Sequence, residues 1–242
     1  GALVCAAVAP IGIFFIVIDA DPNNYYTKDS PLVQAADLVN ENLGGAQNIS
    51  IVLEGDIKDP RLMRKIDNLE KEIGKIPEVG NTTSIARVIR MMSRVLNDEG
   101  EKGYDAIPDT RNAVAQYFEL YSMSGDPEDF EKMVDFPYEN ALITARINTT
   151  STPKLNKIKR QIEEMVKDDK EVKLVGGFAL ILSEIARIVV SGQLISLGLA
   201  IFAVGILIMI LFRSTVAGLI SAIPLALSVL ILFSLMGLFR IE

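Results

Sequence analysis

Two long apolar runs lie next to one another near the C-terminal end of the chain, at residues 188–212 and 214–239. Neither run contains Asp, Glu, Lys or Arg, and the single residue between them is Arg213. An uncharged run of about 20 residues is long enough to cross the hydrocarbon core of a bilayer as a helix. A helix also satisfies its own backbone hydrogen bonds there. The pattern therefore predicts two transmembrane helices joined by a tight turn at Arg213.

A third apolar run occupies residues 1–18 and contains the only cysteine, Cys5, so no disulfide forms within the chain. A signal peptide is the competing interpretation, but a basic leading region and a small-residue cleavage site are both missing. We therefore interpret residues 1–18 as the end of a transmembrane helix that is cut off at Gly1 and leaves the membrane at Asp19. On this interpretation, the chain is a piece of a longer polypeptide.

Between the apolar runs, residues 19–186 show the helix and strand signals of a folded domain outside the membrane. Helices are expected after Ser30-Pro31, Asp59-Pro60 and Thr152-Pro153, because Ser, Asp or Thr before Pro is typical of a helix start. The residue patterns typical of strands occur at 48–54, 79–85, 141–149 and 171–175. From Phe178, a helical pattern continues into the next apolar run.

Residues 86–138 interrupt this order with helical segments at 86–96, at 110–121 and from Ser124 onward. Without this helical insertion, the order is strand-helix-strand, strand-helix-strand, which is that of the split βαβ or ferredoxin-like fold (βαββαβ). The predicted fold class is an α+β membrane protein with transmembrane helices and a ferredoxin-like domain. The predicted boundaries of that domain are residues 19 and 186.

Charge is distributed unevenly over the 242 residues. The chain carries 24 basic and 31 acidic residues, and only Arg187, Arg213, Arg240 and Glu242 lie outside residues 19–186. The central domain therefore has 30 acidic and 21 basic residues. Because nucleic-acid binding needs a basic surface, nucleic acid is not an expected partner.

The residues that catalysis and metal binding most often use are scarce. The chain has no histidine, which removes Ser-His and Cys-His pairs and the commonest metal ligand. Asp19, Asp21 and Asn23 resemble the opening of a calcium loop, but Asn24 and Ser30 stand where Gly and Glu are required. We predict no catalytic residue, no cofactor and no metal site, and hence no enzymatic activity.

The last apolar run carries small residues at intervals of four: Ser214, Gly218, Ala222 and Ala226. On a helix these positions share one face, and small residues there let a neighbouring helix approach closely. We interpret the face as a helix-packing surface, with a sliding surface in a moving bundle as the alternative. Pro224 lies among these residues and is expected to kink the helix.

Neither complete membrane run contains an ionisable residue. Acidic or basic residues inside a membrane are the usual sign of a proton or ion path. Any coupling to a proton gradient must therefore lie elsewhere in the polypeptide. Charge does not fix the orientation either, because Arg213 marks one side of the helix pair and Arg187 and Arg240 mark the other.

Several short motifs follow one another along the chain. They are Asp29-Ser30-Pro31, then Glu41-Asn42-Leu43-Gly44-Gly45 before a strand, then Met123-Ser124-Gly125-Asp126-Pro127-Glu128-Asp129, and finally Phe212-Arg213-Ser214 followed by Gly218 and Pro224. With one membrane helix, a large domain and a helix pair, this order resembles the second half of a transporter of the resistance-nodulation-division (RND) superfamily, specifically the MMPL-like exporters. The resemblance covers essentially the whole chain, although no single motif is diagnostic alone.

The resemblance implies that residues 19–186 form an extracytoplasmic porter domain and that Arg213 lies in a cytoplasmic turn. It implies a multi-pass protein of the cell membrane that exports hydrophobic or amphipathic compounds, such as lipids, driven by the proton gradient. The implied partners are the lipid bilayer, a lipid or other apolar substrate, and the rest of the same polypeptide with a second porter domain. The proton-carrying acids of the family lie on a helix that would follow Glu242.

Some alternatives stay open at this point. A membrane-anchored binding or scaffold module would use the acidic domain to recruit another protein, without transport. Within the superfamily, an accessory to protein export is a further candidate. Whether the protein forms a homo-oligomer is also left open by the sequence.

Overall fold

The computed structural model describes residues 19, 21, 26–27, 29–124 and 127–239. The membrane helix predicted at residues 1–18 lies outside the described residues and stays a prediction. The described chain forms two compact units, each described here by itself. The sheet unit comprises the described residues of 22–150 and 154–181. The helix unit comprises the described residues of 182–239, together with 19, 21 and 151–153.

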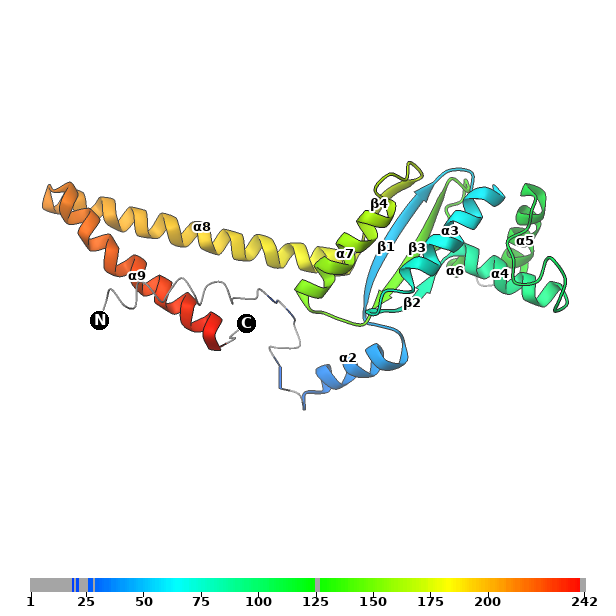
Figure 1. Cartoon of the computed structure of the whole chain (residues 1–242), viewed down its shortest axis with the longest axis horizontal. Coiled ribbons are helices and arrows are strands. Elements are labelled where there is room, and N and C mark those ends of the chain that lie inside the picture. The colour runs from blue at the N-terminus through cyan, green and yellow to red at the C-terminus, as the bar shows by residue number, and fades with distance from the viewer. Residues whose placement is uncertain (1–18, 20, 22–25, 28, 125–126, 240–242) are drawn as a thin grey trace. The chain divides into compact units, whose positions relative to one another are not determined.

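The sheet unit alternates helices and strands, as the sequence predicts. Its elements are α2 (Pro31–Asn42), β1 (Gln47–Glu54), α3 (Pro60–Ile73), β2 (Val79–Thr83), α4 (Ile85–Leu96), α5 (Arg111–Ser124), α6 (Pro127–Glu131), β3 (Asn140–Ile147), α7 (Thr152–Val166) and β4 (Val172–Gly176) (Figure 1). The predicted α+β composition and the four strands are therefore confirmed. Several boundaries differ by one to three residues. For example, β2 ends before Ile85, because the Ser84 side chain accepts a hydrogen bond from the Arg87 backbone N–H and caps α4.

The four strands form one antiparallel sheet in the order β2-β3-β1-β4 (Figure 1). The central strands β1 and β3 pair along their whole length, from Gln47 opposite Ile147 to Glu54 opposite Asn140. Alternate side chains of a strand point to opposite faces, and here every second one is buried. On β1 and β3 these are Ile49, Ile51, Leu53, Ala141, Ile143, Ala145 and Ile147. They share one core with buried residues of α3 and α7.

Helices α3 and α7 each bury one apolar face. On α3 the buried apolar residues include Leu62, Ile66 and Ile73, and on α7 they are Leu155, Ile158, Ile162 and Val166. These positions recur three, four or seven residues apart, which places them on one side of a helix. Asp59 caps α3 by accepting a hydrogen bond from the Arg61 backbone N–H at 2.9 Å. The helices therefore cover the sheet core through the pattern that their sequences carry.

A pair of glycines joins α2 to β1 where the chain passes very close to the sheet. Gly44 and Gly45 have φ of +78° and +128°, which L side chains rarely adopt. A Cβ atom on Gly45 would lie 2.2 Å from the carbonyl oxygen of Ile147, the last residue of β3. Backbone approaches backbone here, so no residue with a side chain fits without moving the end of the sheet.

The helix unit contains the long helix α8 (Phe178–Phe212), whose first residues belong to the sheet unit, and α9 (Thr215–Phe239). Both are long and apolar enough to cross a membrane, and only 6% of the most apolar stretch of each is buried. At 1.5 Å per residue, α8 is roughly 50 Å long. The connection between them is the predicted tight turn: Arg213 has φ of +49°, and Ser214 accepts a hydrogen bond from the Ala217 backbone N–H at 3.3 Å.

Candidate functional site

The predicted small-residue face of α9 meets α8 at one glycine. Gly218 is buried, whereas Ser214, Ala222 and Ala226 are half-buried and Val216, Leu219 and Ile220 on the other sides are exposed. A Cβ atom on Gly218 would lie 2.1 Å from Cγ of Met209 and 2.8 Å from the carbonyl oxygen of Gly205, both on α8. Gly205 in turn would bring a Cβ to 3.9 Å from Cβ of Ala222. Two glycines thus set the closest approach of the two helices.

The other residues predicted for this helix pair have local partners. Ser214 caps α9 at its first turn. The structure keeps α9 helical through Pro224, whose carbonyl oxygen accepts a hydrogen bond from the Ser228 hydroxyl at 2.8 Å. A kink at Pro224 stays a prediction, as does the cytoplasmic placement of the turn at Arg213.

Asp19, the first described residue, accepts hydrogen bonds at the start of α7. Asp19 accepts hydrogen bonds from the Ser151 hydroxyl at 2.6 Å and from the Thr152 backbone N–H at 2.8 Å. The first N–H groups of a helix lack partners within it, and a carboxylate there also suits the helix dipole. Asn23, the third residue of the calcium-like triplet, lies outside the described residues. Within the described ranges, no group of three or more Asp, Glu, His or Cys residues is arranged to hold a metal ion.

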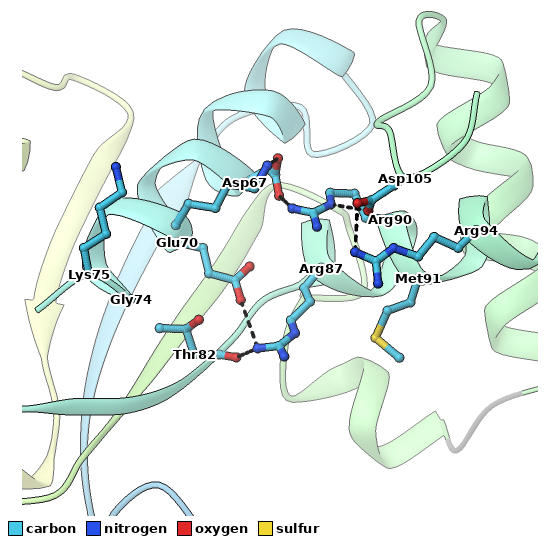
Figure 2. A pocket seen from close by; sticks show the side chains of 11 residues that line it. Asp67, Glu70, Gly74, Lys75, Thr82, Arg87, Arg90, Met91, Arg94 and Asp105 are labelled. Carbon is cyan, nitrogen blue, oxygen red and sulfur yellow. Dashed lines mark hydrogen bonds and ion pairs between the residues drawn. The ribbon is translucent and has the colours of Figure 1, made fainter. Parts of the chain in front are cut away.

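A charged cleft lies between α3, β2 and α4, and sequence reasoning missed it. Its volume is about 480 Å³, and Figure 2 shows the side chains that line it. We call it the α3–α4 cleft. Its lining residues are Asp67, Glu70, Lys71, Gly74, Lys75, Thr82, Arg87, Arg90, Met91, Arg94 and Asp105. Five cations face three carboxylates, so the lining has two more positive than negative charges.

A network of paired charges runs from the floor of the α3–α4 cleft to its rim. Arg90 donates to Asp67 through Nη1 and to Asp105 through Nε, each at 2.9 Å. Arg94 donates to the other oxygen of Asp105 at 2.8 Å (Figure 2). Asp67 and Arg90 are 10% and 18% exposed in their side chains. This network ties α3, α4 and the loop before α5 together, because its members come from all three.

Glu70 lies deeper and is only partly satisfied. It is 4% exposed and accepts a hydrogen bond from the Ser84 hydroxyl through Oε2. Its Oε1 atom has no hydrogen-bond partner among the described residues and lies 3.9 Å from Nη1 of Arg87. Arg87 itself donates through Nη1 to the Thr82 carbonyl at 2.6 Å and to the Asn81 side chain at 3.1 Å. The cleft therefore keeps one buried acceptor that protein groups do not fill.

Hydrogen bonds in the network shift the pKa values of Asp105 and Arg90 so that their charged forms are favoured. The hydrogen bond from Arg94, opposed by burial and reinforced by that from Arg90, lowers the pKa of Asp105 to about 2. Burial disfavours the charged form of Arg90, but its hydrogen bonds to Asp105 and Asp67 outweigh burial and raise its pKa. Asp105 and Arg90 are therefore both charged at neutral pH.

A sequence signal for this cleft existed in α4. Arg87, Arg90 and Arg94 lie three and four residues apart, on the side of the helix away from the buried Ile85 and Ile89. Three cations on one face of a helix within an acidic domain indicate a specialised surface. Their carboxylate partners come from α3 and from the irregular loop after α4, and no helical or strand spacing reveals those.

No family model matches this chain, and no curated protein matches it significantly. The resemblance to exporters therefore depends on the motifs and on the order of the elements.

Proposed function

We propose that the chain is the second half of a proton-driven exporter of the RND superfamily, of the MMPL-like group. In this proposal, residues 19–186 form an extracytoplasmic porter domain that gates or conducts a hydrophobic or amphipathic compound such as a lipid. Helices α8 and α9 cross the cell membrane, with the turn at Arg213 on the cytoplasmic side. The partners are the bilayer, the transported compound and the remaining helices of the same polypeptide.

The exposure of α8 and α9 is the observation that supports the membrane part most strongly. Long apolar helices at the core of a soluble protein are buried, yet Phe202, Leu207 and Ile210 of α8 are 66%, 66% and 72% exposed. Large apolar surfaces are unfavourable in water. A hydrocarbon environment removes that cost, and the uncharged stretches are long enough for it.

The sheet supports the porter part of the proposal. The strand order β2-β3-β1-β4, with every neighbouring pair antiparallel, suits two interleaved βαβ units. Helices α4, α5 and α6 lie between β2 and β3 in sequence, where the helical insertion is expected. Because α8 beyond Arg187 and α9 have no ionisable side chain, the proposal assigns proton uptake to other helices of the polypeptide.

A labelling experiment tests the orientation. In a Cys5→Ser background, Lys102→Cys places a thiol on the sheet unit, where the native side chain is 91% exposed. Arg213→Cys places a thiol at the turn between α8 and α9. A membrane-impermeant maleimide added to intact cells is expected to label position 102 at once and position 213 only after lysis. The reverse pattern, or equal labelling of both positions, contradicts the proposal.

Transport needs its own measurement. The polypeptide that carries this chain, reconstituted into liposomes with an imposed proton gradient, is expected to move a fluorescently labelled phospholipid out of the membrane. A protonophore should stop this movement. If the labelled lipid moves equally with and without the gradient, or does not move at all, the exporter proposal fails and the scaffold alternative is favoured.

A further inference from the structure

We propose that the α3–α4 cleft is a binding site for an anionic head group of the phosphate type, carried by an amphipathic molecule whose apolar part lies along Met91 and Val95. The proposed binding site is argued from the geometry of the sheet unit alone. Its role in selecting the transported compound rests on the proposed function. The two claims are therefore separated in the experiments below.

The charges of the cleft are arranged in two layers. The floor holds Asp67, Glu70 and Arg90, whose side chains are 10%, 5% and 18% exposed. The rim holds cations that reach the solvent, and their side chains are about half exposed or more: Lys71 50%, Lys75 68%, Arg87 49% and Arg94 48%. An approaching ligand therefore meets positive charge first, in a domain that is otherwise acidic.

The rim arginines keep donors that no protein group uses. A guanidinium group has five N–H donors. The side-chain hydrogen bonds of Arg87 all involve Nη1, and that of Arg94 involves Nη2. Among the described residues, Nε and Nη2 of Arg87 and Nε and Nη1 of Arg94 make no hydrogen bond. Arginine suits planar, multi-point recognition of phosphate and carboxylate groups better than lysine does.

The lysines of the rim are partly occupied. Lys71 donates to Asp67 at 2.6 Å, and Lys75 donates at 2.5 Å to Glu72, which lies outside the lining. The strongest attraction for an anion is therefore at Arg87 and Arg94. Below them, the Oε1 atom of Glu70 is buried and lies 3.9 Å from Nη1 of Arg87, so its charge favours the position of Arg87 without contacting the ligand. A closed network of salt bridges would leave no arginine donors for an anion.

The apolar part of the proposal comes from the same helix. Met91 lines the cleft and is 57% exposed, although methionine is usually buried. Val95 is 85% exposed and lies one helical turn further along α4, on the same side as Met91. An anionic group at the arginines would thus have an apolar track beginning at its edge. Methionine suits varied apolar partners because its side chain is flexible and polarisable.

Methyl NMR of the full chain tests the site. The chain is labelled with ¹³C-methyl methionine and placed in nanodiscs of phosphatidylcholine, a lipid with no net charge. The Met91 signal is assigned by its loss in Met91→Leu. Hexyl phosphate, inorganic phosphate and hexyltrimethylammonium are then titrated separately. We expect a saturable shift of the Met91 signal with hexyl phosphate, at least tenfold weaker binding of inorganic phosphate, and no saturable shift with the cation.

The variant Arg87→Gln/Arg94→Gln is expected to weaken hexyl phosphate binding at least tenfold. Its matched control is Lys157→Gln/Arg160→Gln, which removes the same charge from exposed positions of α7 and should bind normally. The buried Met63 and Met133 report folding in every sample, because their signals move only if the sheet unit rearranges. If Arg87→Gln/Arg94→Gln disturbs those signals, Arg94→Lys replaces it: this variant keeps the charge but loses the Nε and Nη1 donors, and it should weaken hexyl phosphate binding.

Specific outcomes overturn the inference. An unchanged Met91 signal, equal responses to hexyl phosphate and the cation, or equal weakening in both double variants means that the cleft charges are only structural. Equal affinity for inorganic phosphate and hexyl phosphate removes the amphipathic part and leaves a free-anion site. The liposome assay separates the two claims. Hexyl phosphate binding with no gradient-driven lipid transport contradicts the proposed function alone. Gradient-driven transport with no binding at the cleft contradicts this inference alone.

Discussion

The sheet unit and the helix unit hold their parts together in opposite ways. In the sheet unit, apolar side chains such as Ile51 and Ile143 are fully buried and charges lie outside or pair in a cleft. In the helix unit, the contact between α8 and α9 is made by glycines, and large apolar side chains point outward. The sheet unit has its apolar side chains inside, as a protein in water has, whereas the exposed apolar side chains of the helix unit suit the hydrocarbon environment of the proposed function. The comparison therefore concerns the surroundings of each part more than its fold.

The largest expected effect is at the glycine turn of the sheet unit. Gly45→Ala is expected to reduce the free energy of unfolding by about 4 kcal/mol, because strain at positive φ adds to a clash with the Ile147 carbonyl. Gly100→Ala is the matched control, since Gly100 has φ of +103° but nothing within 4 Å of an added Cβ. Thermal circular dichroism should show a much larger fall in melting temperature for Gly45→Ala. Equal falls in melting temperature would mean that backbone strain, and not the close approach to Ile147, governs both sites.

The second prediction compares two exposed leucines. Leu199 on α8 is 63% exposed and Leu38 on α2 is 61% exposed. An aspartate near the middle of a membrane helix costs about 2.5–3.5 kcal/mol of insertion free energy, and Leu199 is at the middle of the uncharged run 188–212. Leu199→Asp is therefore expected to reduce the membrane-integrated fraction after carbonate extraction, whereas Leu38→Asp should leave it unchanged. If both variants stay integrated to the same extent as the parent chain, α8 does not lie in lipid.

Much of the sheet unit follows from local patterns in the sequence. The alternation of Ile49, Ile51 and Leu53 predicts both β1 and its buried face, and Asp59-Pro60 predicts where α3 begins. These signals are local because strand and helix periodicity repeat over a few residues. The predicted packing face of α9 likewise singles out Gly218, although Met209 and Gly205 as its neighbours depend on how the turn at Arg213 positions α8.

The α3–α4 cleft is different, because its partners are far apart in the chain. Asp67 on α3 and Asp105 in a loop meet at Arg90 on α4. The loop reaches this position with Asp105 at φ of +49° and with the Ala106 backbone N–H donating to the Ser93 hydroxyl. Such tertiary contacts leave no periodic signal, so only the arginine spacing was visible beforehand. Sites made from distant loops are where local reasoning fails.

The third prediction concerns the contact between the two long helices. Gly218→Ala is expected to destabilise the helix pair by about 2 kcal/mol, because the new methyl group overlaps Met209 and approaches the Gly205 carbonyl. Gly198→Ala is the control on α8, where an added Cβ meets nothing within 4 Å. Thermal unfolding in nanodiscs measures both. Adding Met209→Ala to Gly218→Ala should recover part of the lost stability. If the effects of the two substitutions on stability simply add, the contact between Gly218 and Met209 is contradicted.

The smallest expected effect tests the charged cleft through pH. Asp105→Asn removes the carboxylate shared by Arg90 and Arg94 and is expected to lower the free energy of unfolding by about 1 kcal/mol at pH 7, a modest value because the Asp105 side chain is 33% exposed. The pKa of Asp105 is lowered in the folded state to about 2, from 3.8. Its contribution to stability is therefore complete above about pH 4 and is lost as the pH falls towards 2.

Melting curves of the parent chain and of Asp105→Asn should consequently converge between pH 4 and pH 2. Asp129→Asn is a suitable control, because among the described residues the ion pair of Asp129 is with nearby Lys132, at an exposed site. It should change the melting temperature little at any pH. A constant difference between Asp105→Asn and the parent chain down to pH 2 would show that shape or hydrogen bonding, and not the charge of Asp105, ties α4 to the loop. In that case the charge of Asp105 would not be what holds Arg94 at the rim of the cleft, whereas the interpretation of the glycine contact in the helix unit would be unaffected.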